Sequence, residues 1–563
     1  MLEEDKLKEE IKETEQESKT AAAGDSSENS ASVLMQGVTV LAVAGVISKI
    51  FGAIFRIPLT NLIGAEGQSY YGVAYPIYSL FLVIATAGFP LAISRMVSER
   101  VARKDYINAQ KSFKLAFEFT LGICAISFAV LFFGAEYIAD AWYKNPGAAD
   151  AIKAISFALL FTSVVAPLRG YFQGLQNMKP TALTEVLEQF VRVCVGLGLA
   201  YALFKVSLEK AAAGATFGAS AGLLVAGIVL LIIYQRDKSD RKERLANSVV
   251  IEESDRDRFK EMLGIIIPVT IGSSIMPIMM IIDASIVMRR LLATGWGVTE
   301  AKVLYGLISG YCDPLVNMPV VFIEAVCISL MPAITRAYTL GRKEDLNVNV
   351  KSGLKTMMII SYPCAIGLIV LAGPILHLLY PTKPEEADMA INALRIFAAG
   401  IVFLSTMRTL SSSLQGVGKM GIPVVNLGIA AICKIIISYI LVGIPAININ
   451  GAAFGSFMTY LIASSLNFIA LKKFADVKLD LKDIFLKPMI SALVMGVFAW
   501  VSYKLIFLAT SSNSLATLAS ILIAVVIYFV MVFKTEVLTE EEMKLIPKGD
   551  VIYDIARKMR LTK

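Results

Sequence analysis

The sequence is poor in the residues from which catalytic and metal centres are most often built. Its 563 residues include one histidine and six cysteines. It contains no histidine pair at metal-binding spacing, no glycine-rich phosphate loop and no nucleophile elbow. The aspartate-rich metal motifs of a membrane glycosyltransferase are also absent. We therefore expect no enzymatic activity, no metal site and no cofactor.

The few cysteines and the single histidine offer no reactive cluster. The spacing of the cysteines suits neither a disulfide framework nor a metal site, so we expect them to be inert, small hydrophobic residues. His377 lies near the end of an apolar segment, where an interfacial position is expected rather than a ligand or a base. The cysteines all lie in apolar segments and are Cys124, Cys194, Cys312, Cys327, Cys364 and Cys433.

Charged residues are also scarce, at 18%, whereas 56% of the residues are hydrophobic and the mean hydropathy is +0.67. Such values indicate a polytopic membrane protein. The net charge of +7 does not indicate a nucleic-acid partner, because the basic residues lie in short loops between apolar segments. Residues 1–35 are acidic and lack the apolar core of a secretory signal, so we expect a disordered or weakly helical tail.

Fourteen apolar segments are long enough to cross a bilayer, whose hydrocarbon core of about 30 Å needs about 20 helical residues. Two of them are long enough to tilt or break, and prolines interrupt several. The predicted fold is an all-α polytopic membrane protein. The segments lie near 36–62, 70–97, 113–135, 151–169, 181–204, 211–235, 262–290, 302–335, 353–377, 388–412, 421–444, 450–471, 486–508 and 512–533.

Lysine and arginine concentrate in the loops at one end of these predicted spans. The loops near 95–114, 236–260 and 336–355 are basic, whereas opposite loops such as 64–69 and 444–450 are short and nearly uncharged. Because basic loops stay in the cytoplasm, we expect both termini to be cytoplasmic.

The two halves of the chain resemble each other. Four groups of residues recur in the same order at separations between 237 and 243, which indicates an internal repeat of six spans with parallel topology. The matched groups are Ala92 to Arg95 with Ala333 to Arg336, Lys111-Ser112 with Lys351-Ser352, Gln173-Gly174 and Pro180 with Gln415-Gly416 and Pro423, and Gly214-Ala215 and Phe217-Gly218 with Gly451-Ala452 and Phe454-Gly455. The predicted organisation is a tail (1–35), a first lobe (36–235), a cytoplasmic linker (236–261), a second lobe (262–471), two extra spans (472–533) and a cytoplasmic tail (534–563).

Basic residues inside the predicted spans are the main candidates for a binding site. A cation near the bilayer centre costs at least about 2.5–3.5 kcal/mol, so each needs a partner or a polar cavity. Arg192 and Lys434 are equivalent in the repeat, which favours a shared cavity between the lobes. The candidates for substrate binding are Lys49, Arg56, Arg192, Lys434 and Arg395, and those for ion coupling are Asp283, Asp313 and Glu324.

Two simpler readings of these charges stay open. Lys49 or Arg56 can reach the membrane surface with its long side chain. Arg192 follows Glu188 by four residues on one helix, so the two can neutralise each other. Lys434 has no acidic residue three or four positions away, and this account does not extend to it.

Residues 36–533 resemble the MOP flippase superfamily, and within it the polysaccharide-biosynthesis branch with the stage V sporulation protein B type and the Gram-positive lipid II flippases. The resemblance rests on the fourteen-span layout, the repeated Gln-Gly turn and two segment patterns. These patterns are Ser48-Lys49-Ile50-Phe51-Gly52 with Arg56 and Gly64-Ala65, and Asp313-Pro314-Leu315 with Pro319 and Leu330-Met331-Pro332.

The resemblance implies a protein that moves undecaprenyl-pyrophosphate-linked sugars outward by alternating access between two lobes. It implies substrate-binding roles for Lys49 and Arg56, which stand at the basic positions of the MurJ-type pattern in span 1. Pro314 and Asn317 occupy span-8 positions where that pattern has an arginine and a glutamate, so those roles do not transfer. The last two spans imply a groove for the lipid tail.

We therefore expect a flippase for an undecaprenyl-pyrophosphate-linked cell-wall precursor, first of all lipid II, in a bacterial inner membrane. Its partners are the lipid-linked glycan, the bilayer, and a coupling ion or the membrane potential. Two alternatives stay open. One is a flippase for another lipid-linked polysaccharide unit, and the other is an ion-coupled exporter of cationic compounds with Asp283, Asp313 or Glu324 at its centre.

Overall fold

The computed structural model describes residues 2–249, 251–477, 480–538 and 557–558, without the side chains of residues 2–39, 42, 49, 53 and 325. The regular elements in this part of the chain are all helical, which confirms the predicted fold class. Thirteen of these helices are long and apolar enough to cross a membrane. The first, Val43–Ala102, contains the first two predicted spans, which accounts for the difference from fourteen.

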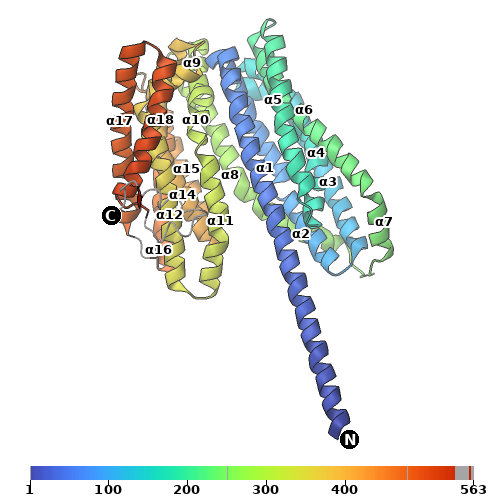
Figure 1. The fold of residues 1–563 in the computed structure, drawn as a ribbon. Helices are drawn as coiled ribbons and strands as arrows, with labels where there is room; N and C mark the ends of the chain where they lie inside the picture. Colours follow the sequence, from blue (N-terminus) through green and yellow to red (C-terminus); the bar gives the residue numbers. More distant parts are fainter. Residues whose placement is uncertain (1, 250, 478–479, 539–556, 559–563) are drawn as a thin grey trace.

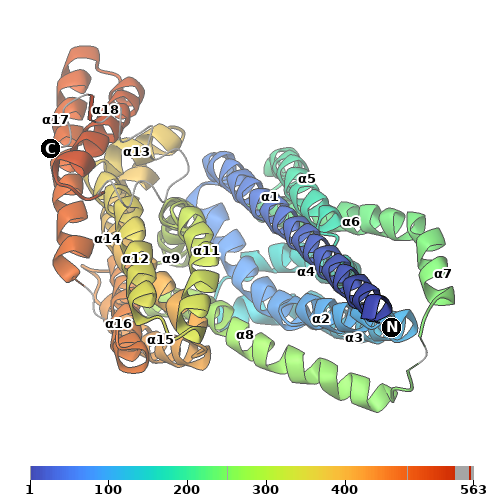
Figure 2. The ribbon, with the colours of Figure 1, turned by 60° about the horizontal axis from the view of Figure 1, so that its bottom comes forward.

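The first group of helices extends from α1 to α6 and lies on one side of the molecule (Figures 1 and 2). The N-terminal part of α1 projects away from the bundle and includes residues 2–35 of the expected tail, where Glu, Lys and Ala favour helix. The elements are α1 (Leu2–Thr86), α2 (Phe89–Ala102), α3 (Tyr106–Tyr137), η1 (Ile138–Trp142), η2 (Pro146–Ala148), α4 (Ala149–Gly174), α5 (Lys179–Phe204), α6 (Leu208–Arg236) and the linker helix α7 (Lys238–Ala246).

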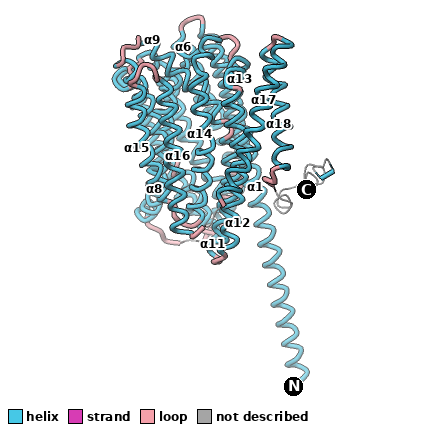
Figure 3. Tube along the Cα trace, turned by 90° about the vertical axis from the view of Figure 1, so that its left-hand side faces the viewer, coloured by secondary structure: helices cyan, strands magenta, loops and turns pink. Residues whose placement is uncertain are grey.

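The second group begins with α8. Its last two helices lie at one edge of the bundle, where α17 packs on α12 and α18 packs on α17 and α13 (Figures 1 and 3). Its elements are α8 (Asp255–Ala293), α9 (Val298–Gly306), η3 (Leu307–Cys312), α10 (Asp313–Asn317), α11 (Val320–Thr339), α12 (Lys343–Val370), α13 (Ala372–Leu379), α14 (Pro384–Gly416), α15 (Gly421–Val442), α16 (Ile449–Ala475), η4 (Lys482–Leu486), α17 (Lys487–Thr510) and α18 (Asn513–Lys534). We call α1–α6 the first lobe and α8–α16 the second lobe.

The helices have two ends, which we name the linker end, where residues 237–249 lie, and the far end. At the far end the sequence predicted a loop over residues 64–69, and the structure instead has a sharp kink at Gly64. The φ angle of Gly64 is 64°, a conformation that glycine adopts without steric cost. The helix resumes directly after this residue, so α1 crosses the molecule and then turns back.

Equivalent glycines bring equivalent helices together in the two lobes. A Cβ atom on Gly218 of α6 would lie 2.7 Å from the carbonyl oxygen of Arg192 on α5. In the second lobe a Cβ atom on Gly455 of α16 would lie 3.5 Å from the Cγ of Lys434 on α15. Glycine is needed at Gly218 because a side chain would separate the helices. The contacts match the repeat, with Arg192 and Lys434 beside the corresponding glycines.

The eighth predicted span is broken into α9, η3, α10 and α11 rather than forming one helix. Pro314 and Pro319 lie at the breaks, and proline supplies no N–H for a helical hydrogen bond. At the first break, Gly306 lies so close to α1 that a Cβ atom would fall 1.7 Å from the carbonyl oxygen of Ala65. The irregular segment is therefore one of the places where the second lobe contacts the first.

The linker is held against the first lobe at the linker end. Arg100 on α2 forms ion pairs with Glu253 and, at 2.8 Å, with Glu261. The backbone N–H of Val249 donates to the carbonyl oxygen of Lys104 at 3.0 Å. Burial disfavours the charged form of Glu253, but its hydrogen bond with Arg100 and the positive charge of Arg100 outweigh this and lower the pKa of Glu253.

Candidate functional site

Two adjoining cavities lie between the lobes. The larger, of about 530 Å³, extends toward the linker end, where it is lined by Ser48 and Gln189 among others. The smaller, of about 210 Å³, lies nearer the far end and is lined by Tyr305 and Tyr460 among others. The residues that line both are Arg56, Tyr75, Met280, Asp313 and Asn317.

Arg56 lies where the two cavities meet. Its guanidinium donates to the carbonyl oxygen of Ser309 in η3 at 2.8 Å and lies 4.7 Å from the centre of the Tyr71 ring. Arg56 has no carboxylate partner within ion-pair distance among the described side chains. A cation held by a carbonyl group and an aromatic face keeps its charge available to an anion in the cavity.

Arg192 lines the larger cavity from α5. Its guanidinium donates to the hydroxyl of Tyr71 at 2.7 Å and lies 5.6 Å from the ring centres of both Phe55 and Tyr75. The pair with Glu188 that the sequence left open is not formed, because Glu188 instead bonds Arg169 at 3.0 Å. Glu188 and Arg192 lie one turn apart on α5, but the residue that bonds Glu188 is Arg169 of the neighbouring helix α4.

Lys434 lines the smaller cavity and forms an ion pair with Asp283 of α8. The partner of Lys434 could not be predicted from the residues of its own helix, because Asp283 lies 151 residues away. The side chains are 11% and 26% exposed, so the pair is mostly withdrawn from water. The positive charge of Lys434 is therefore offset in this conformation, unlike the charges of Arg56 and Arg192.

The remaining predicted residues divide between the cavity wall and other places. Asp313 lines both cavities, and Glu324 lines the larger one. Arg395 lies outside the two cavities, with an exposed side chain that donates to the carbonyl oxygen of Ile369 at 3.3 Å. Lys49 is in α1, but its side chain lies outside the described part of the structure.

Arg408 of α14, which lines the larger cavity from the second lobe, is not among the residues predicted from the sequence. Its Nε atom is buried and has no hydrogen-bond acceptor among the described residues. The signal was present, since Arg408 is a basic residue inside an apolar segment, as Arg192 is. Tyr71 and Tyr75 were also missed, because tyrosine in a membrane span is too common to single out a site.

Polar contacts join the lobes at the far end, beyond the smaller cavity. A carboxylate oxygen of Glu386 on α14 accepts from the backbone N–H of Ala65 at 2.7 Å and from the hydroxyl of Tyr311 at 2.5 Å. The amide of Asn61 donates to the carbonyl oxygen of Leu379 at 2.7 Å. A Cβ atom on Gly64 would lie 3.1 Å from the Glu386 carboxylate, so the glycine at the kink also permits this approach.

An apolar groove of about 640 Å³ lies between α12, α17 and α18, away from the two cavities. Its wall includes Gly367, Met495, Ala524 and Phe529, and the groove is lined almost entirely by carbon atoms. A surface of this kind suits a hydrocarbon chain.

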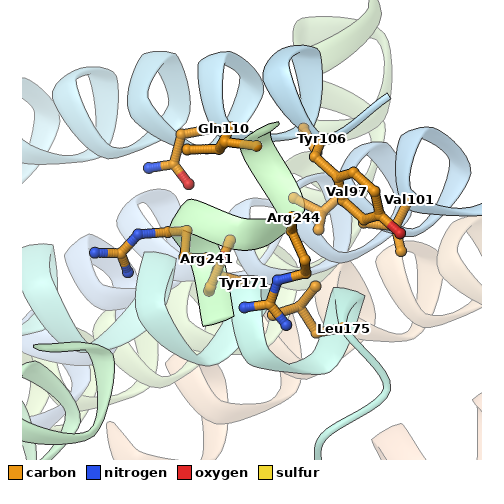
Figure 4. A pocket seen from close by; sticks show the side chains of 10 residues that line it. Val97, Val101, Tyr106, Gln110, Tyr171, Leu175, Arg241 and Arg244 are labelled. Carbon is orange, nitrogen blue, oxygen red and sulfur yellow. The ribbon is translucent and has the colours of Figure 1, made fainter. Parts of the chain in front are cut away.

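A much smaller cavity lies at the linker end of the first lobe (Figure 4). Its volume of about 10 Å³ is close to the space that one water molecule needs. Arg241 of α7 lies 3.8 Å from the ring centre of Tyr234, and Arg244 bonds Asp237 at 2.5 Å. This cavity lies between α7 and helices α2, α3 and α4, and it is a packing feature rather than a ligand site.

Two family models match this chain. The model described as polysaccharide biosynthesis protein matches residues 34–338, and the model described as lipid II flippase MurJ matches residues 190–547.

Several relatives come from Bacillus subtilis (strain 168). The membrane protein YabM is 28% identical over 534 residues, which cover 93% of this chain and 97% of YabM. The lipid II flippase MurJ is 28% identical over 480 residues, 83% of this chain and 88% of that protein. Stage V sporulation protein B is 23% identical over 520 residues, 91% of this chain and 97% of its own length.

Solved structures show the same fold. The lipid II flippase MurJ in an inward closed conformation aligns with a TM-score of 0.66 at 17% identity, over 88% of this chain and 98% of its own. An inward-facing multidrug resistance MATE family transporter of the MOP superfamily aligns with a TM-score of 0.66 at 14% identity, over 76% and 94%.

Proposed function

The chain is a multi-pass membrane transporter of the MOP superfamily that belongs to the polysaccharide biosynthesis protein and lipid II flippase MurJ families, and we propose that it is a flippase for a lipid-linked glycan. The proposed substrate is an undecaprenyl-pyrophosphate-linked cell-wall precursor, with lipid II as the first candidate. The proposed direction is from the cytoplasmic to the outer leaflet of a bacterial cell membrane.

The observation that carries the proposal is the arrangement of Arg56 and Arg192 on the wall of the inter-lobe cavity. Neither has a carboxylate within ion-pair distance among the described side chains, and both are oriented by tyrosines instead. Guanidinium groups bind phosphate oxygens in a two-pronged geometry, and the bond is stronger where water is scarce. The pyrophosphate of a lipid-linked sugar is the group that fits such a wall.

The apolar groove supports the same proposal. The headgroup of a lipid-linked sugar is polar and its tail is a long hydrocarbon, so a flippase has to accommodate both. The groove formed by α12, α17 and α18 offers the tail an apolar path at the edge of the second lobe, while the headgroup occupies the cavity between the lobes.

The conformation fits one step of an alternating-access cycle. The linker end is the proposed cytoplasmic side, because its loops carry the excess of lysine and arginine. The contacts of Glu386 and Asn61 then close the outer side, and the larger cavity extends toward the cytoplasm. An inside-negative potential of 100 mV favours outward movement of each negative charge by about 2.3 kcal/mol, so it is a sufficient driving force for a dianion.

The experiment that tests this proposal is depletion of the protein in its native cell, followed by identification of the lipid-linked precursor that accumulates on the cytoplasmic face. We expect an undecaprenyl-pyrophosphate-linked glycan to accumulate. Cells that carry Arg192→Gln at normal protein levels should accumulate the same precursor, and cells with Arg395→Gln should not, because Arg395 lies outside the cavity.

A second candidate is an exporter of cationic compounds, and the carboxylates of Asp313 and Glu324 on the cavity wall favour it. This candidate predicts that transport depends on the acidic residues of the cavity rather than on its arginines. Glu324→Gln would then abolish function while Arg192→Gln would leave it intact, and depletion would sensitise the cell to cationic compounds without any accumulation of precursor.

A further inference from the structure

Arg408 differs from the other arginines of the inter-lobe cavity. Arg56 and Arg192 donate to a carbonyl group and a hydroxyl, whereas Arg408 makes no hydrogen bond or ion pair with the described residues. Its Nε atom is nevertheless buried. A buried N–H group without an acceptor is unfavourable, and proteins rarely keep one unless water or a ligand bonds it.

The position of Arg408 also separates it from the other two. Arg56 and Arg192 belong to α1 and α5 of the first lobe, and Arg408 belongs to α14 of the second lobe. All three line the same cavity of about 530 Å³. An anion in this cavity therefore meets guanidinium groups from both lobes.

Lys434 does not offer the same contact from the second lobe. It lines the smaller cavity and is paired with Asp283, so an anion has to displace that carboxylate before it can bind the ammonium group. Arg408 has no carboxylate within ion-pair distance among the described side chains, so an anion can bind it without displacing one. Among the described cations of the second lobe, Arg408 is the one that lines the larger cavity.

We propose that Arg408 is the second-lobe half of an anion clamp, and that it binds the same pyrophosphate group as Arg192 so that substrate binding draws the lobes together at the linker end. This inference rests on the proposed function. A pyrophosphate has two phosphoryl groups, and each can accept a two-pronged bond from one guanidinium. Bridging by one ligand favours the conformation in which both lobes reach it, which is how a ligand shifts a conformational equilibrium.

The carboxylates on the same wall supply the competing explanation. Asp313 and Glu324 line the cavity with Arg408, and on the competing account Arg408 serves only to balance their charge. In that case its loss would change the stability of the protein but not the response of the lobes to an anion. The two accounts therefore differ in a measurable response to ligand.

The test uses the full-length protein in lipid nanodiscs with undecaprenyl pyrophosphate as the probe. Spin labels on cysteines at Lys104 and Lys343, both exposed at the linker end and one in each lobe, report the distance between the lobes in a background without native cysteines. Undecaprenyl pyrophosphate should shorten this distance in the wild-type background. Arg408→Gln should weaken binding by about tenfold or more, as expected for loss of a charge-assisted bond, and should abolish the shortening at saturation.

Arg395→Gln is the matched control, since it removes an arginine from the same helix outside the cavity and should change neither measurement. A second variant, Arg408→Cys, guards against loss of folding. Modification of this cysteine with a reagent that adds an ammonium group should restore binding and closure, whereas a neutral reagent of similar size should not.

Three outcomes overturn the clamp. If the Arg408→Gln variant binds undecaprenyl pyrophosphate and shortens the distance between the lobes as the wild type does, Arg408 is not part of the site. Equal responses of Arg408→Cys to the cationic and neutral reagents would show that its charge is not used. Failure of the wild-type protein to bind undecaprenyl pyrophosphate would overturn the clamp together with the proposed function, whereas the first two outcomes leave that function standing.

Discussion

Replacing Glu386 by glutamine should weaken the contact that closes the two lobes at the far end. The Glu386 carboxylate accepts two hydrogen bonds, from the N–H of Ala65 in the first lobe and from the hydroxyl of Tyr311 in the second. The amide oxygen of a glutamine at this position can accept both bonds, but it carries no full negative charge. Both bonds are then weaker than bonds to a carboxylate, and Tyr311 is fully buried.

The size of the effect follows from the bonds that change. Hydrogen bonds to charged groups contribute about 1.5–3 kcal/mol each and neutral ones about 0.5–1.5 kcal/mol. Exchange of the carboxylate for an amide should therefore destabilise the closed conformation of the far end by about 2 kcal/mol. At room temperature that corresponds to about a thirtyfold shift in the ratio of closed to open conformations.

The assay is a distance measurement between spin labels on cysteines at Lys210 and Ala446, which are exposed at the far end of the first and second lobes. Glu386→Gln should add or enlarge a population with a longer distance. Glu385→Gln is the control, because it makes the same chemical change at the adjacent, exposed residue. Identical distance distributions for the wild type and both variants would show that the carboxylate of Glu386 does not hold the far end closed.

Three further predictions concern other parts of the molecule. Asp283→Asn should lower the free energy of unfolding by about 3 kcal/mol, because it leaves the mostly buried Lys434 without its partner, and the double variant with Lys434→Met should recover most of that loss in a thermal melt. Gly367→Phe, which fills the apolar groove, should reduce transport at an unchanged protein level, whereas Gly428→Phe, in similarly open space on α15, should not. Because the pKa of Glu253 is lowered from its ordinary value of 4.5, its contribution to stability is present above that pH and is lost as the pH falls through the lowered value. Hydrogen exchange of residues 247–254 should therefore accelerate on acidification, and Glu253→Gln should remove most of that pH dependence.

The sequence was sufficient to predict the class of the fold and most of its helices. Long apolar runs have one stable solution in a bilayer, the helix, because its backbone groups bond one another. The recurrence of the Gln-Gly turn and the paired glycines likewise indicated a repeat, and the structure places Gly218 and Gly455 beside Arg192 and Lys434. Both features can be read from the residue pattern alone, without knowledge of which helices pack together.

Only the tertiary structure shows which basic side chains face the cavity without a carboxylate partner among the described residues. Arg192 and Lys434 are equivalent in the repeat, yet Arg192 bonds Tyr71 and Lys434 bonds Asp283, which lie 121 and 151 residues away. Arg395 and Arg408 are both arginines in the apolar part of α14, yet only Arg408 lines the cavity. The sequence shows that a charge lies inside a membrane span, but the partner that offsets or orients it comes from another helix, and only the packing of the helices brings the two together.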